Sequence, residues 1–337
     1  MIQEAIVKLC RRENLTDKEM QTVFREIMDG EATPSQMGSF LTALRLKGET
    51  IEEITAAAKI MREKMVKINV RSEDAETIVD TCSTGGSGVN KFNISTTSAF
   101  VVAASGIKVA KHGNRSASSA CGSADVLEEL GVNIMMEPEK SAECVRKIGI
   151  GFLFARLFHP AMKNVAATRK ELGIRTVFNV LGPLASPAAA SAQVLGVYDE
   201  DFVPVMANVL NNLKIRHAFV VHGLDGFDEV SLSGATLVSE VGDGKVSTYK
   251  VKPEDYGLKV CEPKDLFGGD AKENASIVIS VLKGEKGPRR DVVLLNAAFA
   301  IVCAGVAENI KKGIAEAEKS IDSGAAFEKL RRMKEFK

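Results

Sequence analysis

The hydrophobic pattern changes near Arg71, and this change constrains the fold more than any other feature of the sequence. Before it, apolar residues recur three and four positions apart, as in Ile51, Ile54 and Ala58, which is helical spacing. After it, short apolar runs alternate with helical segments, which predicts a mainly parallel central sheet flanked by helices. We therefore expect a small all-helical domain over residues 1–70, joined by a helical segment around 160–190, and an α/β domain over 75–337.

Helix starts are marked clearly in the first part of the chain. Capping boxes begin at Thr16, Thr33 and Thr50, each with Glu or Gln three residues later. Pro34 takes the first helical position of one helix, and Gly48 ends it. Helices this short need a partner surface, so we expect them to pack on one another or across a dimer interface.

The second part of the chain predicts strands with loops at their carboxyl ends. Helices are expected near 95–105, near 123–130 and over most of the last 65 residues, and 236–251 reads as an antiparallel pair around a Gly-Asp-Gly turn. The expected strands are 78–79, 107–110, 151–154, 193–197 and 218–221. In parallel sheets ligands bind beyond the carboxyl ends of the strands, and the two most unusual loops follow the first two strands.

Composition excludes several classes of protein. The 44 basic and 44 acidic residues cancel, which argues against a nucleic-acid wrapper. The six cysteines form no C-x-x-C pair, so a zinc or iron–sulfur site is disfavoured and a reducing, cytoplasmic location is expected. The start of the chain lacks a secretory pattern, and the apolar stretches are too short or too interrupted to span a membrane.

A glycine-rich loop follows the first strand. Ser83-Thr84-Gly85-Gly86-Ser87-Gly88 places three glycines within four positions, so successive backbone N–H groups can form an anion nest. Ser95 and Thr96 then open a helix, whose N-terminus also favours phosphate. The loop is neither a Walker loop nor a dinucleotide fingerprint. A tight surface turn before a capped helix is the alternative.

A basic loop follows the second strand. Lys111-His112-Gly113-Asn114-Arg115-Ser116 combines two cationic side chains with a turn, and Ser118, Ser119 and Ser123 add hydroxyl groups. A solvated basic turn is the alternative. Because both loops belong to neighbouring strand–helix units, the pair predicts a binding site for a sugar that carries a diphosphate.

Two adjacent carboxylates follow a later strand. Asp228 and Glu229 lie beyond the strand that ends at Val221, and such a pair suits Mg²⁺, which also takes phosphate oxygens and water as ligands. A polar turn is the alternative reading. His159 and Arg169 would not be singled out by physical argument alone.

Together these motifs resemble the anthranilate phosphoribosyltransferase family, of the nucleoside-phosphorylase-like class, over nearly the whole chain. The motifs are Gly30–Thr33, Ala43–Gly48, Phe92–Thr96, Lys111–Ser116, Phe178–Pro183 and Asp228-Glu229. The resemblance implies transfer of phosphoribose from phosphoribosyl diphosphate (PRPP) to the amine of anthranilate, with release of diphosphate, in tryptophan biosynthesis. It also implies a Mg²⁺ cofactor and a pentosyltransferase that works by a charge clamp, with no catalytic general base.

The resemblance also implies the residues of the site. Anthranilate is expected at Ser83, Asn114, His159, Arg169 and Pro183, with His112 lining its route, and the metal at Ser95, Asp228 and Glu229. PRPP is expected at Ser83, Gly85, Gly86, Ser87, Lys91, Asn93, Ile94, Ser95, Thr96, Lys111, His112, Gly113, Asn114, Arg115, Ser116, Ser118, Ser119 and Ser123.

Partners follow from the same resemblance. The family implies a homodimer joined through the helical domain, which agrees with the short-helix argument. It leaves open whether the chain works alone or with an anthranilate synthase partner that makes anthranilate. No nucleic-acid or membrane partner is expected.

Three residues depart from the family pattern. Where the family usually reads G-T-G-G-D-G, Ser83 replaces the first glycine and Ser87 replaces the aspartate, while Lys91 stands in place of Thr or Ser. These changes make the loop more positive by two charges. Our hypothesis is that Lys91 replaces part of a metal's charge on the diphosphate.

Two other functions remain open on the sequence. A nucleoside phosphorylase of the same fold would share the phosphate loops, but its expected S-G-R and T-G-G-T-x-D-K runs are absent. The second is a non-enzymatic relative, in which the site that binds PRPP in the family binds nucleic acid or a partner instead. Ser83 and Ser87 favour this alternative. The balanced charge, the intact Lys111–Ser116 loop and the Asp228-Glu229 pair oppose it.

Overall fold

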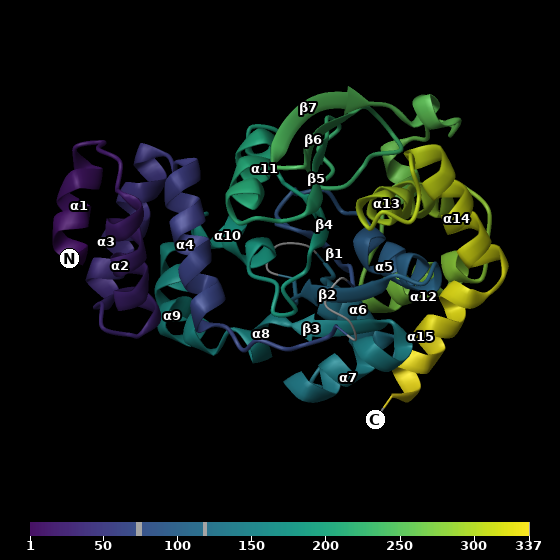
Figure 1. Ribbon diagram of the computed structural model, residues 1–337, viewed down its shortest axis with the longest axis horizontal. Coiled ribbons are helices and arrows are strands. Elements are labelled where there is room, and N and C mark those ends of the chain that lie inside the picture. The colour runs from purple at the N-terminus through teal and green to yellow at the C-terminus, as the bar shows by residue number, and fades with distance from the viewer. Residues whose placement is uncertain (72–75, 117–119, 337) are drawn as a thin grey trace.

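The structure, a computed structural model, describes residues 1–71, 76–116 and 120–336. It has a small helical part at one end and a larger α/β part at the other (Figure 1). The helical part contains α1 (Ile2–Cys10), α2 (Asp17–Met28), α3 (Pro34–Lys47), α4 (Ile51–Lys64) and α9 (Lys163–Leu172). Short helices α8 (Ala155–Phe158) and α10 (Phe178–Leu181) flank α9 in the chain.

The predicted helix starts are confirmed. Thr16, Thr33 and Thr50 each accept a hydrogen bond from the backbone of the third helical residue and complete a reciprocal capping box. Gly48 ends α3 with a φ of 90°, a conformation that residues with a Cβ rarely adopt. Local sequence therefore sets where these helices begin and end.

Aromatic packing holds the helical part together. The ring of Phe24 on α2 lies 6.3 Å from that of Phe40 on α3 and 5.4 Å from that of Phe178. Because Phe178 comes from the segment after α9, a distant stretch of chain closes this core. Figure 1 shows α9 beside the N-terminal helices.

The central sheet has seven strands in the order β3-β2-β1-β4-β5-β6-β7. The first five in this order are parallel, whereas β6 and β7 form an antiparallel pair at one edge. The strands are β1 (Ile78–Ser83), β2 (Lys108–Gly113), β3 (Ile150–Phe154), β4 (Ala192–Gly196), β5 (His217–Gly223), β6 (Thr236–Gly242) and β7 (Lys245–Val251). The predicted fold class, a helical domain with a mainly parallel α/β domain, is confirmed.

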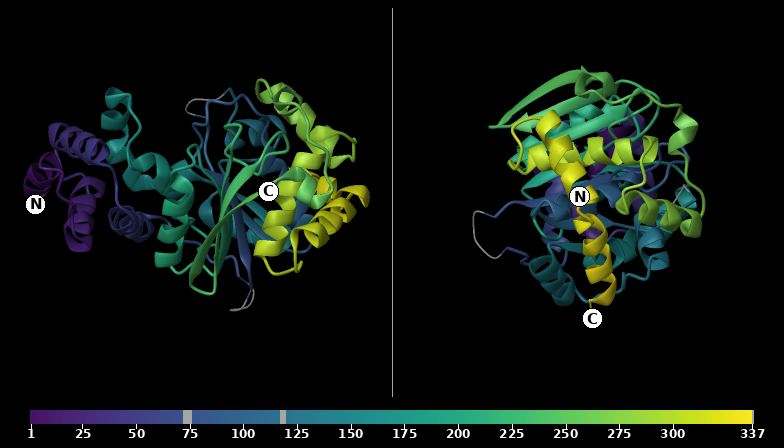
Figure 2. Two further views of the ribbon diagram at one scale, coloured as in Figure 1. Left: turned by 90° about the horizontal axis from the view of Figure 1, so that it is seen from above. Right: turned by 90° about the vertical axis from the view of Figure 1, so that its right-hand side faces the viewer.

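Helices cover both faces of the sheet. On one face α5 (Ile94–Ala104) and α13 (Pro288–Cys303) pack into the larger apolar core, and the C-terminal helices surround them (Figure 2). On the other face α11 (Phe202–Asn212) contacts α4. The remaining helices are α6 (Ser123–Glu129), α7 (Pro138–Ile148), α12 (Ala271–Leu282), α14 (Ile310–Asp322) and α15 (Ala325–Glu335). None of the helices in the described ranges is long and apolar enough to cross a bilayer.

Candidate active site

The glycine-rich loop begins where β1 ends, at the same edge of the sheet as the loop that follows β2. Gly85 and Gly86 have φ values of 65° and 78°, which only glycine adopts without strain. Arg175 Nη2 donates to Gly86 O over 2.5 Å, and its guanidinium lies 4.1 Å from the centroid of the Tyr198 ring. No pattern in the sequence signals this contact of Arg175 with the loop.

Lys111, which was expected in the loop after the strand, lies within β2 and contacts the start of α5. Its Nζ donates to Thr81 O over 2.5 Å and lies 3.4 Å from Ser95 Oγ. Asn93 precedes α5 without capping it through its side chain, so backbone N–H groups of the first turn stay available for an anion. The structure thus brings together Lys111, Ser95 and the N-terminus of α5, on which Ile94 and Thr96 are buried.

Asp80 is a site residue to which the sequence analysis gave no role. It is fully buried in β1, its Oδ1 accepts a hydrogen bond from His112 N over 3.1 Å, and its Oδ2 has no partner. Burial raises the pKa of Asp80 to about 7, although the charge of Lys111 opposes the shift. Burial likewise lowers the pKa of Lys111, and Asp80 opposes that shift. The sequence does contain a signal for Asp80, because an acidic residue stands inside the apolar run from Ile78 to Cys82.

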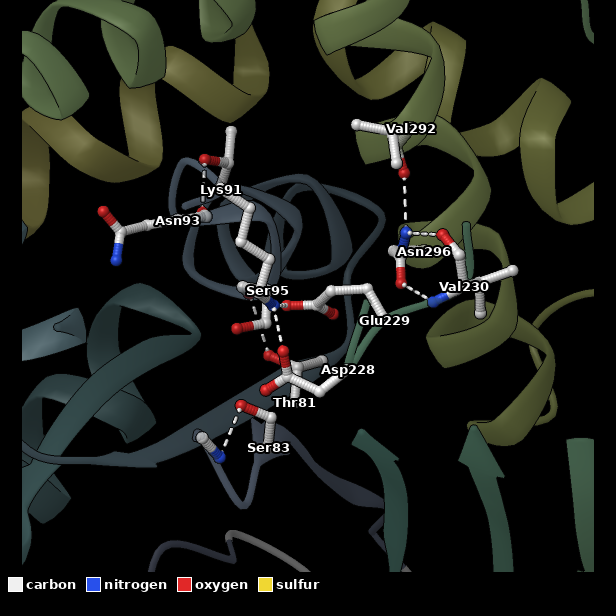
Figure 3. A network of polar contacts seen from close by, with 12 residues as sticks. Thr81, Ser83, Lys91, Asn93, Ser95, Asp228, Glu229, Val230, Val292 and Asn296 are labelled. Atoms are coloured by element: carbon white, nitrogen blue, oxygen red, sulfur yellow. Dashed lines mark hydrogen bonds and ion pairs between the residues drawn. The ribbon is translucent and has the colours of Figure 1, made fainter. Parts of the chain in front are cut away.

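Asp228 and Glu229 lie in the loop after β5, and both are buried. Lys91 Nζ is 2.6 Å from Glu229 Oε1 and 3.2 Å from Asp228 Oδ1 (Figure 3). Burial opposes ionisation of Asp228, but the charge of Lys91 and hydrogen bonds from Ser83 and Ser87 outweigh it and lower the pKa. Burial raises the pKa of Glu229 despite the opposing charge of Lys91.

Two neighbours fix the backbone of this acidic pair. Asn296 on α13 accepts a hydrogen bond from Val230 N over 3.0 Å and donates to Val230 O over 2.8 Å. Gly196, at the end of β4, lies so close to Asp228 that a Cβ there would collide with the Asp228 carbonyl. The backbone that carries the two carboxylates is therefore fixed by contacts with α13 and with the end of β4.

The acidic pair fits Mg²⁺ when a ligand supplies further oxygens. Among the described residues, no three His, Cys, Asp or Glu side chains gather as a metal site of their own. Mg²⁺ is usually held by one or two carboxylates together with substrate phosphates and water. Asp228 Oδ1 is buried, and the cation beside it is the Lys91 ammonium at 3.2 Å, so this oxygen can serve as a metal ligand in competition with Lys91. Figure 3 draws Ser95, Asp228 and Glu229 within one polar network.

A second group of the expected residues meets at two histidines. His112 Nε2 and His159 Nε2 are 3.2 Å apart, and both rings are buried. Burial lowers the pKa of His112 to about 3 and that of His159 to about 4, so both are neutral at physiological pH. The backbone of Gly182 forms a hydrogen bond with the side chain of His112. Pro183, the next residue, therefore lies near the two histidines.

Arg169 on α9 is a half-buried cation. Its guanidinium lies 5.4 Å from the centroid of the Phe178 ring, and burial lowers its pKa. No carboxylate within the described part of the chain forms an ion pair with it. An unpaired, partly desolvated guanidinium favours an anionic ligand.

The basic loop is only partly directed at the site. Arg115 forms ion pairs of 2.8 Å with Asp125 and Glu128 on α6, so its guanidinium faces this helix rather than Lys111. Asn114 Oδ1 accepts a hydrogen bond from Arg115 N, and Asn114 O accepts one from Ser123 Oγ.

Ser116 lies close to Gly122 and to the start of α6. Ser116 N donates to Asp125 Oδ2, and a Cβ on Gly122 would collide with the backbone at Ser116. Gly113 ends β2, and α6 begins at Ser123. Ser118 and Ser119, two of the residues expected at PRPP, lie outside the described residues.

Comparison with known proteins identifies the family. The "Glycosyl transferase family, a/b domain" matches residues 75–327, and the "Glycosyl transferase family, helical bundle domain" matches residues 3–65. The anthranilate phosphoribosyltransferase of Geotalea uraniireducens is 54% identical, with 99% of this chain and 98% of the relative covered. That of Acetivibrio thermocellus is 53% identical over 100% and 96%.

Solved structures agree. The crystal structure of anthranilate phosphoribosyltransferase from Thermus thermophilus has a TM-score of 0.93 at 44% identity and covers 98% of each chain. The enzyme from Saccharomyces cerevisiae, in complex with PRPP and Mg, has a TM-score of 0.87 at 30% identity over 99% of this chain and 97% of that one. From its sequence and its fold, this chain belongs to the anthranilate phosphoribosyltransferase family.

Proposed function

We propose that this protein transfers phosphoribose from PRPP to the amine of anthranilate, giving N-(5-phosphoribosyl)anthranilate and diphosphate, in L-tryptophan biosynthesis. The observation that carries the proposal is the meeting of three features at one edge of the sheet. These are the glycine-rich loop, the buried Lys111 beside the N-terminus of α5, and the buried Asp228-Glu229 pair. The relatives that share the whole chain carry the same activity in their names.

The anion-binding groups act on the leaving diphosphate. As the bond from ribose to diphosphate breaks, negative charge grows on the diphosphate and positive charge on the ribose. Lys111 and the N–H groups of the glycine-rich loop and of α5 are fixed in place before the reaction, so they stabilise this charge without reorganising. Mg²⁺, when bound with Asp228, Glu229 and Ser95, would supply further charge neutralisation at the diphosphate.

The second subsite positions the nucleophile. Arg169 pairs with the carboxylate of anthranilate through its planar fork, and the neutral His112 and His159 line the route without adding charge. The aromatic amine of anthranilate is largely neutral at pH 7, so the chain needs no general base. This subsite contributes to the rate by holding the amine close to the ribose carbon that it attacks.

Loss of anthranilate fluorescence tests the function. Mixing the protein with PRPP, Mg²⁺ and anthranilate should cause a rapid loss that stops when PRPP or the metal is omitted. A folded protein that gives no loss would refute the proposal. A gel shift with single-stranded DNA at moderate salt, which we expect to be negative, tests the alternative of a nucleic-acid-binding relative.

Assembly and location belong to the same proposal. We expect a homodimer joined through the helical domain, for which the exposed apolar residues Val7 on α1 and Leu46 on α3 give support. Light scattering should give twice the chain mass, and Leu46→Lys should lower it. Contact with an anthranilate synthase partner stays a prediction, which co-purification tests. Six free cysteines support work in the reducing cytoplasm.

A further inference from the structure

The three departures from the family pattern converge on one carboxylate. Lys91 forms an ion pair with Asp228, and Lys91, Ser83 and Ser87 all act to lower the pKa of this carboxyl group. In sequence these residues are more than 130 positions from Asp228, so nothing but the fold joins them. A change at one of them thus alters the surroundings of the same oxygen atoms as a change at the others.

Lys91 occupies the position between the two carboxylates. Its side chain is 14% exposed, against 2% for Asp228 and 5% for Glu229, and its Nζ lies 2.6 Å from Glu229 Oε1 and 3.2 Å from Asp228 Oδ1. The backbone holds it there, because Lys91 forms an isolated bridge with Phe267. Figure 3 shows the lysine side chain reaching across to both carboxylates.

A buried pair of adjacent carboxylates needs a cation. Two like charges held together and away from water strongly disfavour the doubly ionised state, and an ammonium within hydrogen-bonding distance of both compensates. With Lys91 the group carries a formal charge of −1. An aspartate at 87 and a neutral residue at 91 would give −3, a far stronger attraction for a divalent cation.

We propose that Lys91 is the resident cation of the Asp228-Glu229 pair and weakens the binding of divalent metal to the free protein. This inference deepens the proposed function and rests on it. The sequence suggested that Lys91 acts on the diphosphate of the substrate. The structure revises this hypothesis, because the ammonium of Lys91 forms ion pairs with the two carboxylates. Lys91 thus acts through Asp228 and Glu229, and it sets their affinity for a divalent metal before substrate binds.

Mn²⁺ binding to the substrate-free protein tests the inference. Free Mn²⁺ is measured by its electron paramagnetic resonance signal, with wild type, Lys91→Met and Lys91→Arg compared at equal protein concentration. We expect Lys91→Met to lower the Mn²⁺ dissociation constant by about tenfold or more, since a competing charge is removed from the ligands. Lys91→Arg keeps the charge and should stay close to wild type.

Two controls locate the effect and guard against misfolding. The double variant Lys91→Met with Glu229→Gln should lose the gain, because one of the two carboxylates is gone. Lys91→Thr replaces Lys91→Met if the latter does not fold by circular dichroism. Equal Mn²⁺ affinity in wild type and a folded neutral variant would overturn the inference. So would a gain that survives in the double variant, or one that Lys91→Arg shares.

The outcome does not depend on turnover. Mn²⁺ binding needs neither PRPP nor anthranilate, so tighter binding in Lys91→Met supports the resident cation even if the fluorescence assay shows no reaction. Conversely, an active enzyme with unchanged Mn²⁺ affinity in Lys91→Met keeps the proposed function and discards this inference.

Discussion

Lys111 shows how a single buried charge is defined by the groups it faces. Its ammonium is held by Thr81 O and lies beside Ser95 Oγ, close to the start of α5. Asp80 keeps a compensating acidic group within reach of it. Such a cation cannot relax into water, so its charge is available to a diphosphate at this edge of the sheet.

Lys111→Met should lower kcat by about 10²- to 10³-fold, the usual loss when one preorganised group that stabilises developing charge is removed. Steady-state rates measured by anthranilate fluorescence give the value. Lys108→Met, on the same strand but paired with Glu76, is the matched control and should stay near wild type. Equal activity of the two variants would show that Lys111 has no part in the charge clamp.

Arg169→Met should raise the KM for anthranilate by about 10- to 100-fold, which is the worth of a charge-assisted hydrogen bond. The KM for PRPP should change little, because Arg169 lies beside Phe178 rather than at the glycine-rich loop. Lys170→Met alters an exposed neighbour on the same helix and serves as control. A rise in the PRPP KM alone would contradict the assigned subsite.

At the scale of elements, the ends of strands position the site. The glycine-rich loop, the basic loop and the acidic pair follow β1, β2 and β5, and the parallel pairing carries their carboxyl ends to one edge. The end of β4 contributes no side chain but leaves space for the acidic loop at Gly196.

Gly196→Ala should reduce activity strongly, because its Cβ would collide with the Asp228 carbonyl and lie 3.2 Å from Ser83 Cβ. Either the acidic loop or the start of the glycine-rich loop must then move, and displacement of a positioned group costs rate. Gly38→Ala in α3 is the control, because its nearest neighbours are 3.9 Å away and alanine favours a helix. Initial rates compare the two, and a fully active Gly196→Ala variant would contradict this reading of β4.

A structural feature could be predicted from the sequence when it depends on residues that are close together in the chain. The capping boxes of α2, α3 and α4 were predictable because each depends on residues three apart in the chain. The alternation of strands and helices gave the fold class for the same reason. The contacts of Lys91 with Glu229 and of Arg175 with Gly86 O join residues 138 and 89 positions apart, and no local pattern encodes such a distance.

At the scale of the whole molecule, the two parts share one apolar core. Residues of α2, α3 and α4 belong to the same buried cluster as those of α11 and of β4 and β5. The helical part is therefore continuous with one face of the sheet. The His112–His159 contact joins β2 to the chain that leads into α9.

Acid should destabilise the whole fold through the buried histidines. The pKa of His159 is lowered from 6.5 to about 4 by burial. The unfolded chain therefore gains a proton as pH falls below 6.5 while the folded chain does not, and stability is lost from there towards about pH 4. Between pH 7 and pH 5 the loss from this group is about 2 kcal/mol.

His159→Asn removes this group and should lose less stability over the same range in urea unfolding followed by circular dichroism. His217→Asn removes a partly exposed histidine paired with Glu240 and is the comparison variant. Identical pH dependence in wild type and His159→Asn would show that the buried pair does not control acid stability.

Transfer of phosphoribose with release of diphosphate can be followed by ³¹P NMR of the complete reaction. With PRPP, Mg²⁺ and anthranilate present, we expect one diphosphate released and one phosphoribosyl monoester formed for each anthranilate consumed. Without anthranilate, the PRPP signals should persist on the same time scale. Diphosphate release that does not depend on anthranilate, or anthranilate loss without diphosphate, would contradict the proposed reaction.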